Sequence, residues 1–272
     1  QAGSGDGSGF VPTVVPAAIE ALRAPTVLEG LGTTVIRNAT GNLQFPRVSA
    51  KAAGTGETEV SADAASGMEM DELSLTPTRV AANTKYSKQL ILQGGAEVDT
   101  LIANELAAAM NAFVDDYAFD AIMASTDVDV YNTADAALSS TVANAMEAAV
   151  LAAGGNLGGA SYVMSPQAYL LSKSLAQVAD VNALWENGQF NMYNAVATPY
   201  LVNDTLDATG TGGRMIFGNF AQGGLLAYFG GIDILIDQYS NASTAQIALH
   251  VNRFFDFGIR QGGALSRAVK LS

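Results

Sequence analysis

The single histidine is the first side chain that could do chemistry. His250 lies on the polar face of a predicted strand, residues 246–252, because side chains alternate between the two faces of a strand. The opposite face of this strand carries Ile247, Leu249 and Val251. Catalysis or metal binding needs partner groups, and the chain has no second histidine and no cysteine. We therefore interpret His250 as a polar residue facing solvent or an interface, and predict no catalytic residue, metal or cofactor.

Carboxylates offer the other route to chemistry, because two facing acids can act as proton donor and base. They form three clusters: Asp115, Asp116 and Asp120; Glu69, Asp71 and Glu72; and Asp127, Asp129 and Asp135. Successive helix residues point apart, so we interpret the first cluster as a solvated acidic face. A hydrolase using Asp115–Asp120 stays open as an alternative. The third cluster lacks the ligand and the turn glycine of a calcium loop, since Tyr131 stands at a ligand position.

Composition favours a self-associating structural protein over an enzyme or a nucleic-acid binder. The 272 residues include 13 basic and 26 acidic side chains, which gives a net charge of −13. Such a balance argues against tight binding to phosphates. Hydrophobic residues make up 49% and charged residues only 14%, and the mean hydropathy is +0.21, so we expect apolar surface to be buried between copies. No phosphate-binding loop, signal peptide or run of about 20 apolar residues occurs.

Apolar periodicity predicts an α+β fold. The longest element is a helix of about 28 residues, or 42 Å, within residues 96–125, with Glu97 and Asp99 in its first turn. Other expected elements are a short helix between Pro16 and Pro25, a hairpin over 33–50 turning at 40–42, strands returning near 73–82, helices over 141–155 and 166–177, a strand at 161–165, and strands towards the end of the chain. Residues 50–67 are small, polar and rich in glycine, which predicts an extended loop.

The order of these segments resembles that of the major capsid proteins of tailed double-stranded DNA bacteriophages, whose Hong Kong-97-type fold is shared with encapsulin shells. The likeness to the family's arm and entry strand rests on VPAAIEALRAPTVLEGLG and GNLQFPRV, and the likeness to its extended loop on KAAGTGETEVSADAASGMEMDELSLTPTRV. The long helix is similar to the family's spine helix, and YVMSPQAYLLSKSLAQ is similar to its axial domain. The closing strands match MIFGNFAQGGLLAYFGGIDILID and VNRFFDFGIRQGGALSRAVKLS.

The resemblance implies a division of the chain and a function. It implies an arm and entry strand over 1–48, an extended loop over 49–75, a peripheral domain over 76–126 and 244–272, and an axial domain over 127–243. It implies a subunit of an icosahedral capsid that assembles with itself into hexameric and pentameric capsomers and encloses double-stranded DNA through weak, non-specific contact. Portal and cement proteins are further implied partners, with no membrane; the implied location is the virion, assembled in the host cytoplasm. An encapsulin-type protein compartment is the nearer alternative.

One departure from the family and one further likeness to it rest on single residues. Some capsids weld their subunits through an isopeptide bond between a loop lysine and an asparagine, but Lys51 is the only lysine in this loop and lies on its outgoing side. We therefore expect no such crosslink. Gln1 resembles the end left by a maturation protease in many capsids, and we expect the first ten residues to be flexible.

Overall fold

The computed structural model describes residues 27–50, 69–132, 134–175, 184–186, 188–206, 210–237 and 239–272. The expected helix between Pro16 and Pro25 and almost all of the 50–67 loop lie outside these residues. The chain divides into two compact units, one formed in its described parts by Ala82–Ala109 and Ile234–Val251, the other by the remaining described residues.

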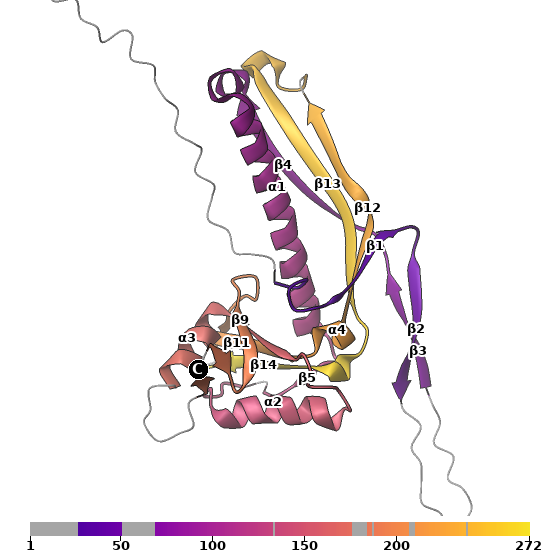
Figure 1. Cartoon of the computed structure of the whole chain (residues 1–272), viewed down its shortest axis with the longest axis vertical. Coiled ribbons are helices and arrows are strands. Elements are labelled where there is room, and N and C mark those ends of the chain that lie inside the picture. Colours follow the sequence, from indigo (N-terminus) through magenta and orange to yellow (C-terminus); the bar gives the residue numbers. More distant parts are fainter. Residues whose placement is uncertain are drawn as a thin grey trace, which may run out of the picture. The chain divides into compact units, whose positions relative to one another are not determined.

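Fourteen strands and four α-helices make up the described residues, and Figure 1 shows their order along the chain. The helices are α1 (Lys88–Ala124), α2 (Ser140–Ala152), α3 (Pro166–Leu175) and the single turn α4 (Phe220–Gly223). The strands are β1 (Thr34–Ala39), β2 (Leu43–Ala50), β3 (Glu69–Leu75), β4 (Thr78–Ser87), β5 (Asp129–Val130), β6 (Ser161–Met164), β7 (Trp185–Glu186), β8 (Gln189–Phe190), β9 (Tyr193–Ala197), β10 (Asp204–Thr205), β11 (Thr211–Gly218), β12 (Gly224–Asp237), β13 (Gln246–Ile259) and β14 (Leu265–Leu271). The α+β fold class is confirmed.

Helix α1 is longer than the sequence predicts. It begins at Lys88 directly after β4 and spans 37 residues, or about 56 Å, passing through Gly94 and Gly95. The expected start near residue 96 is therefore wrong, and Glu97 and Asp99 lie well inside the helix rather than in its first turn. Each glycine costs only about 1 kcal/mol relative to alanine, and the flanking Lys-Gln-Leu-Ile-Leu-Gln stretch consists mainly of good helix formers. None of the described helices is long and apolar enough to cross a bilayer.

The largest sheet joins the strands in the order β5-β14-β11-β6-β9-β8-β7, with β10 paired to β11. Its core packs α2 and α3 against the sheet through fully buried Met146, Ala168, Tyr162 and Phe217. Helix α3 approaches β11 so closely that a side chain at Gly213 would meet the Ala168 backbone at 2.7 Å. The expected helices and the strand in this part of the sequence are confirmed.

A second sheet has the order β1-β12-β13-β4, and β2 pairs only with β3 in a separate ribbon. The expected turn between β1 and β2 is present, with Gly41 at a φ of +71°. The expected hairpin is wrong, because β1 pairs parallel to β12, with Thr34 opposite Leu225, and β2 pairs antiparallel to β3. The strands returning from the loop are also present, but β3 and β4 belong to different sheets.

Candidate assembly surfaces

The environment of His250 gives it no catalytic partner among the described residues. The predicted apolar face is confirmed, since Ile247, Leu249 and Val251 are all buried. On the other face Ala248 is also buried, whereas His250 is only partly exposed. Hydrogen bonds from Ser240 and from the Tyr239 N–H lower the pKa of Asp237 to about 2, and the charge of His250 adds a smaller effect in the same direction. In the described part of the chain, no group of three potential metal ligands occurs.

The carboxylate of Asp115 binds the first described residues of the chain, Val27 and Leu28. Asp115 is 2% exposed, and its oxygens accept hydrogen bonds from the backbone N–H groups of Val27 (2.7 Å) and Leu28 (3.3 Å). Burial raises its pKa, and the two backbone donors partly offset that rise. The predicted solvated acidic face is therefore wrong for this residue. Asp116 and Asp120 lie one turn apart, and partial burial together with the charge of Asp120 raises the pKa of Asp116.

Asp256 likewise accepts a hydrogen bond from a backbone N–H group, at the connection between β3 and β4. Its carboxylate is 8% exposed and accepts hydrogen bonds from the Thr76 N–H at 2.8 Å and from the Tyr117 hydroxyl at 3.4 Å. Thr76 lies between β3 and β4, so Asp256 fixes the point at which the chain returns from the ribbon. The carboxyl groups of both buried aspartates thus accept hydrogen bonds from backbone N–H groups, so their role is to stabilise the fold.

Arg47 ties the base of the β2–β3 ribbon to the body of the same unit. Its guanidinium donates to Asp71 across the ribbon, at 2.6 and 3.0 Å, and to Asp127 at 2.7 Å. It also donates to the Ile259 carbonyl at 3.3 Å. The Arg47 hydrogen bonds hold the pKa of Asp71 below its usual range. Beside this clamp, a side chain at Gly258 would meet Leu75 at 2.7 Å, so the ribbon base packs closely on β13.

Arg267 caps the carboxyl end of α1. Its guanidinium donates to the carbonyls of Ile122 (3.0 Å) and Met123, in the last turn of the helix. A cation there complements the partial negative charge of the helix end. Burial lowers the Arg267 pKa, and the nearby Asp129 opposes that effect. The remaining acidic residues named from the sequence, Glu69, Glu72 and Asp135, are exposed.

Strand β12 carries an unusual exposed surface in its second half. Residues Leu225–Phe229 are buried, but Ile234, Leu235 and Ile236 are 56%, 59% and 55% exposed. Consecutive apolar residues point to opposite sides of a strand, so both sides of this stretch are open. The pairing of β1 with β12 ends at Phe229. We call Ile234–Ile236 the exposed half of β12.

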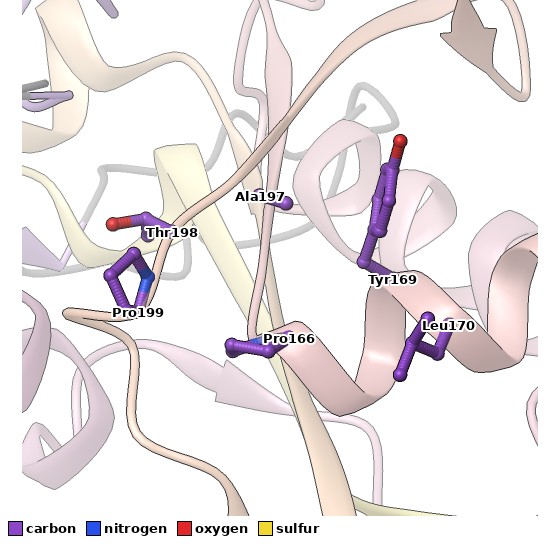
Figure 2. A pocket seen from close by; sticks show the side chains of 6 residues that line it. All are labelled: Pro166, Tyr169, Leu170, Ala197, Thr198 and Pro199. Carbon is purple, nitrogen blue, oxygen red and sulfur yellow. The ribbon is translucent and has the colours of Figure 1, made fainter. Parts of the chain in front are cut away.

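A small apolar pocket lies where α3 begins. Its cavity volume is about 280 Å³, and Figure 2 shows the lining side chains, which come from the start of α3, the last residue of β9 and the two residues after β9. They are Pro166, Tyr169, Leu170, Ala197, Thr198 and Pro199. Leu170 is 63% exposed at its rim. The ammonium group of Lys173 lies 5.1 Å from the ring centroids of Tyr169 and Trp185, which puts a positive charge beside the pocket.

The tip between β8 and β9 presents a protruding methionine. Met192 is 88% exposed, more than any other large hydrophobic side chain among the described residues. Asn191 and Met192 both have left-handed φ angles, +47° and +70°. Asn191 is held there by hydrogen bonds from its side chain to Glu147 (2.5 Å) and from its N–H to the Leu184 carbonyl (2.7 Å). We call this feature the Met192 tip.

Sequence reasoning missed most of these features. The ribbon clamp had a readable signal, because basic Arg47 and acidic Asp71 flank the loop at positions that an antiparallel ribbon brings opposite each other. The roles of Asp115 and Arg267 had none, since their partners are backbone groups 88 and 145 positions away in the sequence. Neither the pocket nor the Met192 tip has a sequence motif.

The fold is that of capsid proteins. The structure is similar to the capsid chain of an empty GTA particle, with a TM-score of 0.72, 15% sequence identity, and coverage of 97% of this chain and 96% of that one. It is also similar to a chain of Gordonia phage Cozz, with a TM-score of 0.64, 15% identity, and coverage of 99% and 94%. Identities this low define the fold alone.

Sequence comparison gives the family. The model of the phage capsid family matches residues 7–269, so the chain belongs to the phage capsid family. It is also 25% identical over 261 residues to the major capsid protein of Halomonas phage phiHAP-1, covering 92% of this chain. The chain spans 42% of the length of that curated relative. The resemblance drawn from the order of segments is confirmed.

Proposed function

We propose that this protein is the structural subunit of an icosahedral virus capsid, assembling with itself into hexameric and pentameric capsomers around double-stranded DNA. The observation that carries the proposal is the family match over residues 7–269. The exposed half of β12 supports it, because a lone subunit leaves that apolar surface in water. The net charge of −13 suits an inner wall that does not grip phosphates, so packaged DNA stays free to move.

Within this proposal the parts of the chain take different tasks. Residues 49–75 form the loop that reaches a neighbouring copy, and the Arg47 clamp fixes the direction in which the β2–β3 ribbon leaves the subunit. Residues 76–126 and 244–272 form the peripheral domain, residues 127–243 the axial domain, and residues 1–48 the arm and entry strand. The task is mechanical rather than catalytic: both buried aspartates already bind backbone groups, and the pocket is lined by no carboxylate.

Expression of the chain, followed by size-exclusion chromatography and cryo-electron microscopy of the particles, tests the proposal. We expect closed icosahedral shells in which each subunit matches the fold described above. Because relatives can be longer than this chain, a version carrying the flanking sequence of its gene is assayed in parallel. A chain that stays monomeric in both versions at high concentration contradicts the proposal.

The content of the particles separates the two shell alternatives. Intact particles recovered from infected or induced cells should absorb more strongly at 260 nm than at 280 nm, as DNA-filled shells do. An encapsulin-type compartment would instead show a protein-like ratio and a protein cargo by mass spectrometry. Virion fractions should contain the chain, and portal or cement proteins should copurify with them.

A further inference from the structure

The Met192 tip and the apolar pocket are complementary in size and character. The pocket, at about 280 Å³, is smaller than the roughly 300–1,000 Å³ of most small-molecule sites and suits one or two side chains. Met192 has a long, flexible apolar side chain, and most of that side chain contacts no other residue of its own chain. The backbone is left-handed at both Asn191 and Met192, and the hydrogen bonds of Asn191 maintain this conformation.

Met192 cannot fill the pocket of its own subunit. Both are attached to β9, whose start follows Met192 and whose last residue, Ala197, lines the pocket. Five residues of strand separate them by about 17 Å. Because β9 runs parallel to β6 and α3 follows β6, the pocket lies at the carboxyl ends of these strands and Met192 at the amino end of β9. The partner for each must come from elsewhere.

Charge also matches between the two features. Beside the Met192 tip lies the carboxylate of Glu147 on α2, which accepts hydrogen bonds from the Asn191 side chain (2.5 Å) and from the Tyr162 hydroxyl (2.7 Å). The pocket carries the Lys173 ammonium group. A negative charge beside the Met192 tip and a positive charge beside the pocket favour one docking orientation of two copies. Two subunits of net charge −13 need such a local attraction where they touch.

We propose that Met192 of one copy inserts into the pocket formed by Pro166, Tyr169, Leu170 and Pro199 of the next copy, with Glu147 facing Lys173 across the contact. Each copy provides one protruding Met192 side chain and one pocket, at opposite ends of β9. Such a head-to-tail contact, repeated with rotation, closes a ring. This inference rests on the proposed capsid function and specifies a contact within a capsomer.

Two introduced cysteines test the contact cleanly, because the chain has none of its own. In assembled particles of Met192→Cys/Ala197→Cys, a bifunctional maleimide with a reach well below 17 Å should join neighbouring copies into a ladder ending at closed rings. The same two cysteines are too far apart to join within one chain. Particles mixed from the two single variants should give dimers and nothing larger, because each chain then has one thiol. Met192→Cys/Leu151→Cys is the matched control, since Leu151 is 56% exposed but lies outside the pocket, and it should give no ladder.

The outcomes separate this inference from the proposed function. Shells that form normally but show no ladder, with the cysteine at position 197 still free to react, overturn the inference and leave the capsid function standing. A wild-type chain that forms no shells overturns the function instead. As a second measurement independent of cysteine chemistry, Met192→Glu should reduce ring formation at least tenfold, whereas Met192→Leu should keep it. Equal assembly of these two variants also contradicts the inference.

Discussion

The two halves of β12 have similar residues and opposite surroundings. In the first half, Leu225, Leu226 and Phe229 are buried beneath β1 and its neighbours. In the exposed half, Ile234, Leu235 and Ile236 are each more than half exposed. Apolar sequence alone therefore does not mark the core of this protein. The first half is buried by residues of its own chain and the second half is not, so the two halves should respond differently to the same mutation.

Leu226→Ala should have the largest effect, on folding itself. Leu226 is fully buried, and removing its side chain leaves a cavity that costs about 2–5 kcal/mol. Urea unfolding of the unassembled subunit measures the loss. Leu235→Ala is the matched control, because the same change at a 59% exposed position should cost less than about 0.5 kcal/mol. Equal losses at the two positions would remove the distinction between the two halves.

Asp115→Ala should have the next largest effect, because it leaves the N–H groups of Val27 and Leu28 buried without an acceptor. The expected cost is about 1–3 kcal/mol, again by urea unfolding. A pH series tests the raised Asp115 pKa. The folded chain then holds the proton more tightly than the unfolded chain, so this residue makes stability fall as pH rises from the ordinary aspartate pKa to the raised one. Asp115→Asn should flatten that part of the profile, and an unchanged slope contradicts the assignment.

Leu235→Ala should weaken assembly even though it spares folding. If another copy covers the exposed half of β12, assembly buries the exposed part of the Leu235 side chain. Removing that side chain should then weaken each contact by about 1 kcal/mol, which corresponds to a roughly fivefold higher protein concentration for shell formation. Light scattering over a concentration series measures it. Leu151→Ala, at an exposed leucine on α2, serves as the reference. Assembly unchanged relative to that reference would mean that the exposed half of β12 stays open to water.

Moderate salt should strengthen assembly by a smaller amount. Subunits of net charge −13 repel one another, and physiological ionic strength screens this repulsion over about 8 Å. Light scattering from low to moderate salt should therefore show shells forming at lower protein concentration. Weaker assembly over that range would indicate that local ion pairs such as Glu147 with Lys173 outweigh the overall repulsion.

No covalent bond should join the subunits. Lys51, the only lysine of the loop, lies on its outgoing side, and the return side has none up to Thr84. Intact-mass measurement of dissociated particles should give only the monomer mass. Covalent dimers or larger species would contradict this expectation.

Local sequence patterns predict most helices and strands correctly. Prediction fails where a strand pairs with a segment far away in the sequence. Pro166 opens α3 as its fixed φ favours, and glycines 154 and 155 follow α2. The pairing of β1 could not be read locally, since its partner β12 begins 190 positions after Thr34. A turn at Gly41 satisfies a hairpin and a change of sheet equally well.

The candidate site was predictable in kind but not in detail. Composition indicated surface reserved for other copies, and the order of segments indicated the family. The burial of Asp115 could not be foreseen, because its helical neighbours Asp116 and Asp120 are more exposed and the sequence makes all three look alike. The Met192 tip depends on two left-handed residues, and neither is a glycine that would have marked the turn.

The choice of methionine at the β8–β9 tip bears on how one polypeptide can build shells of mixed symmetry. Five-fold and six-fold arrangements tilt adjacent members by different amounts, so a stiff plug would suit only one of them. In the proposed contact, an unbranched thioether with three rotatable bonds could bend to follow either angle while its sulfur and terminal methyl group stay inside the pocket of the next copy.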